Sequence, residues 1–336
     1  MAPTPGPADP LHRPEGGVRI VADVGGTNAR FATLGASPRA LERIEVMASA
    51  DHPRLEDAIV AYIRRWGIAD VAGVCLAVAG PAEQDVVQFP NSPWSFSKAA
   101  LSRSLGAPLV VVNDFTAQAL CIDLLRDDEL SWVGRPRPAG AGYRAVIGPG
   151  TGLGVAVQAP GGEVVPSEGG HMAFAPTNEH EIELLRALHG RYGRVSIERV
   201  LSGPGLENLH WANVRLATGD LAPAQLLAPE VAALARSGDA LARRSVEDFF
   251  DILAEFAGDV ALMVWATGGV FLSGGVPARL MDFFDGARFR ARFEDKGRFR
   301  EFAGSVPIAW ITAEYPGLLG CAAALAGAHA EGRAVS

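Results

Sequence analysis

The chain has 336 residues, 49% of them hydrophobic and 20% charged, and is therefore long enough for two domains, each with its own core. The formal net charge is −8, and no tract of Lys and Arg is interleaved with aromatic residues, so nucleic acid is excluded as an expected partner. The three cysteines, Cys75, Cys121 and Cys321, lie far apart in or beside apolar stretches, which indicates buried thiols rather than a disulfide framework.

The N-terminal stretch, residues 1–18, is rich in proline and lacks the basic head and apolar core of a secretory signal, so we expect a disordered tail. The most apolar later segment, 259–276, is interrupted by glycines and contains Asp259, which argues against a membrane span. We therefore expect a cytoplasmic protein without membrane contact.

Residues 19–124 have the pattern of a small α/β domain. The stretch 19–34 predicts a strand, a glycine turn and a second strand, and 53–66 predicts a helix with Leu55, Ile59 and Tyr62 on one face. A buried strand follows within 71–81, then a short helix at 97–106 and an apolar strand within 107–115.

The segment 127–143, with Gly and Pro throughout, is expected to be a loop at a domain junction. After it, "RAVIGPGTGLGVAVQ" repeats the strand, glycine turn and strand of "RIVADVGGTNARFATL", which indicates an internal duplication. The large α/β domain, 125–313, is expected to contain helices near 178–191, 197–212 and 240–267 and a strand at 269–273. A terminal helix at about 314–332 is expected to return to the first domain.

The two glycine turns suit an anionic ligand. Gly25, Gly26, Gly150, Gly152 and Gly154 can take positive φ and let main-chain N–H groups approach phosphate oxygens, and Thr27 and Thr151 add hydroxyls. Either turn alone is equally compatible with a simple tight hairpin. Dinucleotide binding is the second interpretation, but a leucine occupies the third glycine position of the fingerprint in "GPGTGLG".

The apolar run "VVNDFTAQAL" ends its strand in Asn113 and Asp114. Phosphoryl transfer from ATP to an alcohol needs a carboxylate that accepts the hydroxyl proton, and Asp114 suits that role. The alternative is that it caps the following helix. Both roles can coexist, since Asn113 can cap or bind sugar while Asp114 faces a cleft.

Eight motifs, spread in order from residue 19 to the C-terminus, resemble the bacterial glucokinases of the actin-like sugar-kinase superfamily. They are "VADVGGTNARF", "NDFTAQAL", "GPGTGLGVA", "EGGHMAFAP", "ERVLSGPGLENL", "GGVFLSGGV", "FEDKGRF" and "PGLLG". The resemblance implies two related actin-like (ribonuclease H-like) lobes around a central cleft, and a homodimer. It further implies transfer of the ATP γ-phosphoryl group to the 6-hydroxyl of D-glucose, giving glucose 6-phosphate, the first step of glycolysis.

The same resemblance assigns roles to residues. Asp114 is implied as the base, and the residues that bind glucose hydroxyls are Asn91, Asn113, Asp114, Glu168, His171 and Glu198. Taken singly, Glu168 can be a turn residue, His171 a core histidine and Glu198 an acid in the first turn of a helix.

Binding of ATP is implied at both glycine turns and at the "GGVFLSGGV" segment. The candidate nucleotide-binding residues are Ala22, Asp23, Val24, Gly25, Gly26, Thr27, Gly150, Thr151, Gly152, Gly274 and Gly275. Asp23 is implied to organise Mg²⁺ through water, or else only to stabilise its turn. The chain has no P-loop lysine, so Mg²⁺ and main-chain amides must carry most of the charge neutralisation. The alternative for residues 268–276 is a helix C-cap followed by a strand turn.

Two other functions remain open. A kinase of another hexose is possible because the polar set does not settle the C2 substituent, and a non-catalytic sugar-sensing regulator can use the same fold. Such regulators often carry a DNA-binding helix-turn-helix before the kinase-like region, whereas only a short tail precedes Arg19 here, which favours an enzyme. The related repressor/kinase family typically has a cysteine-rich zinc motif after a similar histidine, and none follows His171, so zinc is not expected. "FEDKGRF" has no predicted role.

Overall fold

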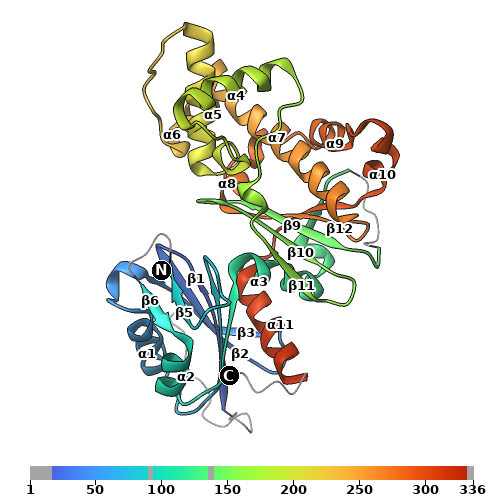
Figure 1. The fold of residues 1–336 in the computed structure, drawn as a ribbon. Coiled ribbons are helices and arrows are strands. Elements are labelled where there is room, and N and C mark those ends of the chain that lie inside the picture. Colours follow the sequence, from blue (N-terminus) through green and yellow to red (C-terminus); the bar gives the residue numbers. More distant parts are fainter. Residues whose placement is uncertain (1–16, 90–93, 135–139, 331–336) are drawn as a thin grey trace. The chain divides into compact units, whose positions relative to one another are not determined.

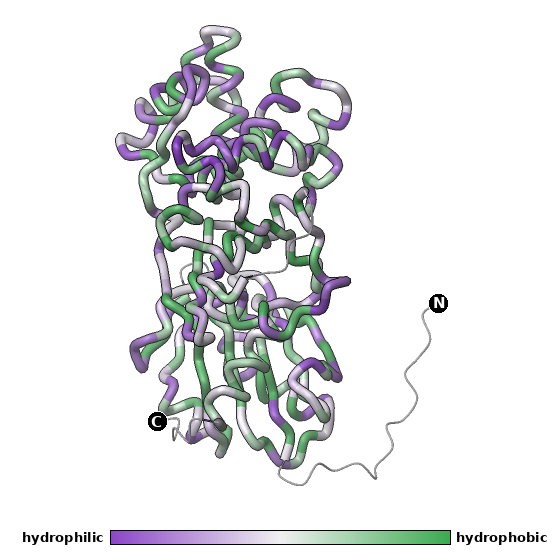
Figure 2. Tube along the Cα trace, turned by 90° about the vertical axis from the view of Figure 1, so that its right-hand side faces the viewer, coloured by the Kyte–Doolittle hydropathy of each residue, from purple (hydrophilic) through white to green (hydrophobic). Residues whose placement is uncertain are grey.

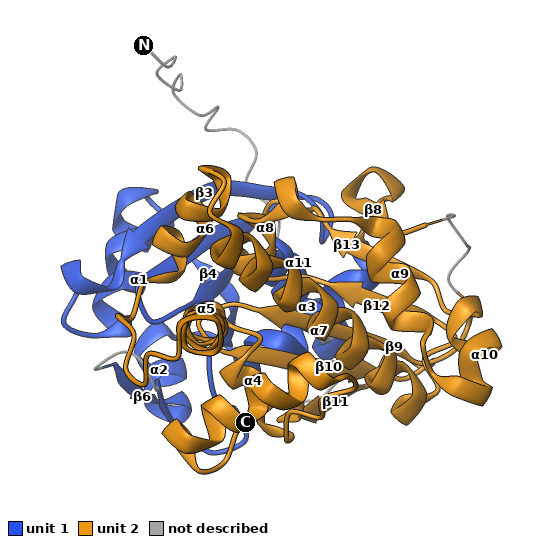
Figure 3. Ribbon diagram, turned by 90° about the horizontal axis from the view of Figure 1, so that it is seen from above, with its two compact units in different colours: residues 1–124, 315–336 blue, residues 125–314 orange. Residues whose placement is uncertain are grey.

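The computed structural model describes residues 17–89, 94–134 and 140–330 (Figure 1). The predicted tail thus lies outside the described residues, except for Gly17 and Val18, and Val18 already belongs to the first strand. Along the chain, hydrophobic stretches alternate with hydrophilic ones (Figure 2). The chain divides into two compact units, which we describe separately (Figure 3). Unit 1 comprises Met1–Leu124 and Tyr315–Ser336, and unit 2 comprises Leu125–Glu314. Within the described ranges, no helix is both long and apolar enough to cross a membrane.

Unit 1 is built on a five-stranded sheet with the order β3-β2-β1-β4-β7. Its strands are β1 (Val18–Val24), β2 (Asn28–Leu34), β3 (Leu41–Ala48), β4 (Val71–Val78) and β7 (Leu109–Asn113). Strands β1, β4 and β7 run parallel, while β2 and β3 are antiparallel to their neighbours. Because parallel strands end at the same edge, Asp23 near the end of β1 and Asn113 at the end of β7 belong to one carboxyl edge of the sheet.

Helices cover both faces of this sheet. They are α1 (Leu55–Arg65), α2 (Lys98–Leu105), α3 (Asp114–Cys121) and α11 (Pro316–Ala330), and a small ribbon is formed by β5 (Val86–Gln88) and β6 (Ser95–Ser97). The alternation of side chains along β1 sends Ile20 into the core with α1, and Val21 into the core with α3 and α11. Asp23 follows Val21 by two residues and therefore lies on the α3 and α11 face. The terminal helix packs beside α3 in Figure 1.

Unit 2 repeats this topology. Its sheet has the order β11-β10-β9-β12-β13-β8, made of β8 (Leu130–Trp132), β9 (Arg144–Pro149), β10 (Leu153–Gln158), β11 (Val164–Ser167), β12 (Gly269–Leu272) and β13 (Ile308–Ile311). Strands β9, β12 and β13 are parallel, and β10 and β11 form the antiparallel edge, as β2 and β3 do in unit 1. The prediction of two related α/β lobes is confirmed by this shared strand order.

One strand lies inside the segment predicted as a loop. Strand β8 begins at Leu130 and pairs antiparallel with β13, Trp132 facing Ala309. Three residues are too few to show alternation, and the partner strand is far away in sequence, so only the folded sheet reveals this strand. The prediction that 127–143 is loop throughout was wrong at this point.

The helices of unit 2 share one core, centred on a long helix, α7 (Ala240–Val264). The others are α4 (Glu179–Tyr192), α5 (Gly203–Thr218), α6 (Ala228–Arg236), α8 (Gly275–Ala278), α9 (Gly286–Glu294) and α10 (Arg300–Ser305). The helix predicted at 197–212 begins later than expected. Residues 197–199 form a separate 3₁₀ turn, and Ser202 caps α5 by accepting a hydrogen bond from the Gly205 N–H at 2.9 Å.

Candidate active site

Asp23 lies in a confined position in unit 1. A Cβ added to Gly317, in the first turn of α11, would lie 2.9 Å from the Asp23 Cγ, so the helix start leaves room only for glycine. Arg30 sits opposite Asp23 in the β1–β2 register, and its Nη1 lies 3.5 Å from Asp23 Oδ2. Burial raises the pKa of Asp23, and the Arg30 guanidinium opposes that change.

Asp114 is the first residue of α3, and its Oδ1 accepts a hydrogen bond from the Phe115 N–H at 2.9 Å. Burial raises the pKa of Asp114 to about 6; the Phe115 hydrogen bond opposes this rise, and the Asp23 carboxylate adds to it. Two carboxylates therefore interact electrostatically at the carboxyl edge of this sheet. At neutral pH most of Asp114 is ionised, and its pKa still lies close enough to neutrality to suit a group that must accept a proton.

Asn113 is the main cap of α3. Its Oδ1 accepts from the N–H groups of Phe115 and Thr116, at 2.9 and 3.2 Å, and its Nδ2 donates to the Gly80 carbonyl at 3.2 Å. The alternative role of Asp114, capping α3, is thus performed chiefly by Asn113. Asn113 orients the start of α3, and its side chain also hydrogen-bonds to the Asp114 carboxylate, which opposes the rise in the pKa of Asp114.

The glycine turn of unit 2 is braced by Glu198. Glu198 Oε2 accepts a hydrogen bond from the Leu153 N–H at 2.9 Å, and a Cβ on Gly152 would lie 2.6 Å from the same oxygen. The turn is closed by Gly150, whose N–H donates to the Gly152 carbonyl at 2.8 Å, while its own carbonyl accepts from Gly203 at the start of α5. Glu198 is thus placed by the turn, in a 3₁₀ segment rather than in the first turn of an α-helix.

The glycines of the two turns do not use unusual backbone angles, and a close approach explains glycine only at Gly152. None of Gly25, Gly26, Gly150, Gly152 and Gly154 has a positive φ, contrary to the use we expected for them. At Gly152 the reason for glycine is the Glu198 carboxylate, which occupies the space of a side chain. A left-handed φ of 102° occurs instead at Gly274, where a Cβ would lie 2.2 Å from the Pro149 carbonyl oxygen.

Glu168 precedes a tight 3₁₀ turn, Gly169–His171, and His171 is its last residue. The turn packs on β10. A Cβ on Gly170 would lie 2.0 Å from the Leu153 carbonyl oxygen, so glycine is required there. The Glu168 and His171 side chains are 77% and 61% exposed, with His171 Nε2 3.8 Å from Glu168 Oε2. His171 is therefore no core histidine. Glu198 hydrogen-bonds to the Leu153 N–H, and the turn that carries Glu168 and His171 packs against Leu153 at Gly170.

A cavity of about 320 Å³ lies beside the "GGVFLSGGV" segment, residues 268–276. Its lining is mostly apolar and consists of Leu206, Ala228, Pro229, Ala232, Arg236, Val276, Arg279 and Leu280. Gly274 caps the N-terminus of α8, which contains Gly275 and Val276, while the C-cap of α7 is Trp265, before this segment. Arg236 is held at the rim by Asp282, with Nε 2.8 Å from Oδ2.

The sequence-predicted residues fall into two groups. Unit 1 holds Ala22, Asp23, Val24, Gly25, Gly26, Thr27, Asn113 and Asp114, and unit 2 holds Gly150, Thr151, Gly152, Glu168, His171, Glu198, Gly274 and Gly275. Asn91 lies outside the described residues. Sequence reasoning missed Arg30 as the partner of Asp23. The predicted hairpin could have revealed it, because a turn at 25–28 places positions 23 and 30 opposite each other. It also missed the cavity, whose lining comes from several helices and carries no local signal.

Comparison with known proteins identifies the family. The family model "Glucokinase" matches residues 20–328. A glucokinase from Chromohalobacter salexigens is 43% identical over 311 residues, covering 91% of this chain and 97% of that relative. The crystal structure of a glucokinase from an Antarctic psychrotroph matches with a TM-score of 0.83 and 33% identity, covering 92% of this chain and 99% of the other. A ROK family glucokinase from Streptomyces griseus, crystallised with glucose and AMPPNP, shares the fold at a TM-score of 0.61 and 20% identity, covering 91% and 98% of the two chains. The chain therefore belongs to the glucokinase family.

Proposed function

We propose that Asp114 is the general base of the glucokinase reaction that this chain catalyses. The observation that carries the assignment is the carboxylate itself: it lies at the carboxyl edge of the unit 1 sheet, held by the Phe115 N–H, with a pKa raised by burial to about 6. Such a group is ionised at neutral pH and still basic enough to take a proton from an alcohol as the new bond forms.

In this mechanism the glucose 6-hydroxyl oxygen attacks the γ-phosphorus of ATP, and Asp114 accepts the hydroxyl proton. The bond between the γ-phosphorus and the β,γ-bridging oxygen breaks, so ADP leaves with the electron pair and glucose 6-phosphate is formed. Neither of the two lysines of the chain, Lys98 and Lys296, lies in a glycine-rich phosphate loop. We therefore assign most of the neutralisation of the phosphate charge to main-chain N–H groups and a metal ion.

For glucose binding, we follow the family pattern. We assign it to Asn91, Asn113 and Asp114 together with Glu168, His171 and Glu198 of unit 2. The exposed carboxylate of Glu168 and the exposed imidazole of His171 are available to sugar hydroxyls. A site that pairs each hydroxyl discriminates against sugars that lack one, because the unmatched protein group is then left unpaired.

For ATP, we assign the turns 22–27 and 150–152 to the phosphates, and the cavity beside Gly274 and Gly275 to adenine. An apolar cavity of about 320 Å³ has the size and lining that a flat purine needs. The Streptomyces griseus structure holds AMPPNP and glucose on the same fold, which supports a nucleotide and a sugar as the ligands of this chain.

Asp23 fits a magnesium ion. Mg²⁺ usually keeps several waters and takes one or two carboxylates plus substrate phosphates, and Asp23 offers one carboxylate near Asp114, whose pKa is raised by burial and further by the Asp23 charge. Among the described residues, no group of three or more His, Cys, Asp or Glu forms a complete metal cage. When bound, Mg²⁺ supplies positive charge to the phosphates, and Asp23 would hold it through water.

The pKa of Asp114 predicts the acid limb of the pH profile. Only the ionised base accepts a proton, so kcat/KM for glucose should rise with pH and level off above pH 6. At pH 5 we expect about a tenth of the plateau value. The measurement is initial rate at subsaturating glucose and saturating MgATP from pH 5 to 8. A profile that is flat between pH 5 and 7 would contradict the base assignment.

A panel of hexoses tests the substrate. With MgATP, we expect phosphorylation of glucose to exceed that of fructose, mannose and N-acetylglucosamine in kcat/KM, measured by ADP release. Faster phosphorylation of another hexose would replace glucose as the substrate, and no ADP release with any of them would favour the sugar-sensing regulator. The homodimer implied by the family resemblance remains a prediction, and the molar mass from light scattering tests it.

A further inference from the structure

A buried charge cluster lies behind the sugar-binding turn of unit 2. It contains Glu181 of α4 and Glu255 of α7, which are 3% and 5% exposed, and Arg292 of α9. The Arg292 Nη2 lies 2.5 Å from Glu181 Oε1 and also contacts Glu255 Oε1. Three helices therefore meet at this one cluster.

The cluster holds the chain that follows His171. Thr177 donates its N–H to Glu181 Oε2 at 2.7 Å and its hydroxyl to Glu255 Oε1 at 2.8 Å. At the other end of this short segment, the Met172 carbonyl accepts from the Ile197 N–H at 2.8 Å, one residue before Glu198. The segment 172–177 is thus fixed at one end by the sugar-binding candidates and at the other by the cluster.

The cluster has one carboxylate more than its guanidinium can neutralise. Glu255 Oε2 is buried and has no hydrogen-bond partner among the described residues. Glu255 also lines a cavity of about 60 Å³ with Met172, Phe174 and Ala175 of the same segment. Burial, reinforced by repulsion from Glu181, raises the pKa of Glu255 to about 8. At neutral pH the carboxyl is therefore protonated, and its second oxygen is not a buried unpaired charge.

Lys296, in the "FEDKGRF" segment, secures the same stretch of α7. Its ammonium donates to the Glu255 main-chain carbonyl at 3.0 Å and pairs with Asp259 Oδ1 at 2.7 Å. The Lys296 side chain is only 6% exposed, so it belongs to the packed interior and is not a free surface cation. The motif without a predicted role therefore anchors the helix that carries Glu255.

We propose that Glu255, in its neutral form, is a positioning residue for glucose, acting through Thr177 on the turn that carries His171. Arg292 and Lys296 hold Glu255 in place. This inference rests on the proposed sugar-binding role of His171. It assigns Arg292 and Lys296 to substrate geometry rather than to chemistry.

The inference predicts a pH effect on sugar binding. This effect is separate from the fall in kcat/KM at acid pH that the pKa of Asp114 predicts. The charged groups around Glu255 are Glu181 from α4, Arg292 and Lys296 from the α9 region, and Asp251 and Asp259 from its own helix. Ionisation of Glu255 above pH 8 places a second negative charge beside Glu181, which disfavours the observed arrangement. The KM for glucose should therefore rise between pH 7 and 9, while the KM for ATP should not.

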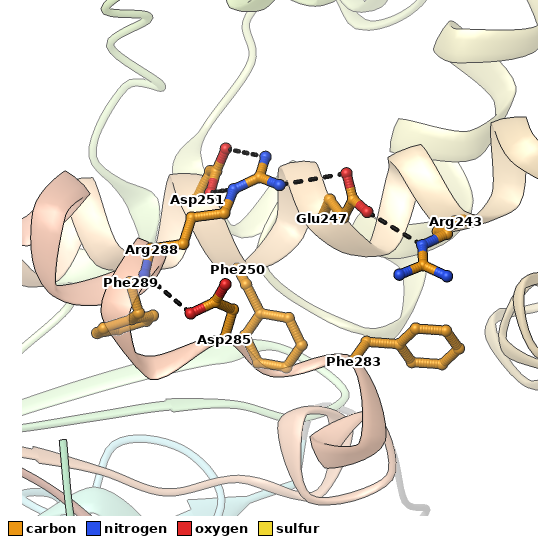
Figure 4. Close-up of a pocket in the computed structure, with 8 residues that line it drawn as sticks. All are labelled: Arg243, Glu247, Phe250, Asp251, Phe283, Asp285, Arg288 and Phe289. Carbon is orange, nitrogen blue, oxygen red and sulfur yellow. Dashed lines mark hydrogen bonds and ion pairs between the residues drawn. The ribbon is translucent and has the colours of Figure 1, made fainter. Parts of the chain in front are cut away.

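The matched control comes from the same helix, two turns before Glu255. There Glu247 pairs with Arg243 and Arg288, at 3.2 Å each, around a separate pocket of about 120 Å³ (Figure 4). Glu247→Gln removes a carboxylate from the same helix without touching Thr177. In this pocket, Arg288 is also held by Asp251 at 2.7 Å, so the loss of one ion pair should leave the helix packing intact.

The experiment measures KM for glucose and for ATP at pH 7, 8 and 9 in wild type, Glu255→Gln, Glu255→Ala, Glu247→Gln and His171→Ala. Glutamine keeps an oxygen for Thr177 and cannot ionise, so Glu255→Gln should abolish a rise in glucose KM that we expect to be about threefold or more in wild type. Glu255→Ala should raise glucose KM about fivefold at pH 7 with ATP KM within about twofold. Glu247→Gln should follow wild type.

A rise in glucose KM that persists in Glu255→Gln would overturn the positioning role, as would equal changes of both KM values in Glu255→Ala. If Glu255→Ala fails to fold, the comparison of Glu255→Gln with wild type still tests the positioning role of Glu255. His171→Ala separates the two proposals. If it leaves glucose KM unchanged, the proposed sugar site is wrong; if it raises glucose KM while the Glu255 variants match wild type, only the positioning role is wrong.

Discussion

Asp114→Asn is expected to lower kcat by roughly 10²–10⁴-fold while glucose binding stays within about threefold of wild type. Asparagine has nearly the same shape and keeps an oxygen for the Phe115 N–H, but it cannot accept the proton of the 6-hydroxyl. The loss should therefore appear in turnover, measured by ADP release, and not in the glucose Kd, measured by calorimetry without nucleotide.

The stability of this variant gives an independent test. The folded-state pKa of Asp114 is raised to about 6 from the ordinary value of 3.8, so ionisation between those values destabilises the folded protein as pH rises. Asparagine carries no charge, and Asp114→Asn should melt no lower than wild type at pH 7.5. Asp57→Asn is the matched control, because Asp57 occupies the first turn of α1, exposed and paired with Arg54. Retention of more than about a tenth of wild-type kcat in Asp114→Asn would remove the base assignment.

Gly320→Ala is expected to destabilise unit 1 by about 3 kcal/mol or more, which lowers Tm by roughly 6–12 °C. Gly320 lies within α11, where helix propensity alone favours alanine by about 1 kcal/mol. Tertiary packing reverses that preference, because the added Cβ would lie 1.8 Å from the Ala117 carbonyl oxygen of α3. A main-chain atom cannot rotate away as a side chain can, so the two helices must separate.

Separation of α11 from α3 should also affect activity. Asp114 begins α3, and Gly317 at the start of α11 lies against Asp23, so both carboxylates depend on this packing. Gly327→Ala is the control in the same helix, since nothing lies within 4 Å of its added Cβ, and it should leave Tm unchanged or slightly raised. Equal melting temperatures for both variants, measured by calorimetry, would show that the close helix approach is not required.

The sequence by itself determined the features that depend on neighbouring residues. Apolar runs that end in glycine predicted the β1–β2 and β9–β10 hairpins, and their repetition predicted two related lobes, which the shared strand order confirms. The position of Asp114, directly after an apolar strand, also followed from local pattern. The order of eight motifs identified the family, because each motif is local even though the site that they imply is not.

Only the tertiary structure decided how those residues are used. Gly152 and Gly320 are glycines because a carboxylate and a carbonyl from distant segments occupy the space of a side chain, not because their own backbone angles demand it. The short strand β8 exists only through its pairing with β13. The role of Lys296 likewise depends on its contacts with α7. Periodicity and turn chemistry act within a few residues, whereas burial, pKa shifts and the exclusion of a Cβ arise from contacts between segments far apart in the chain.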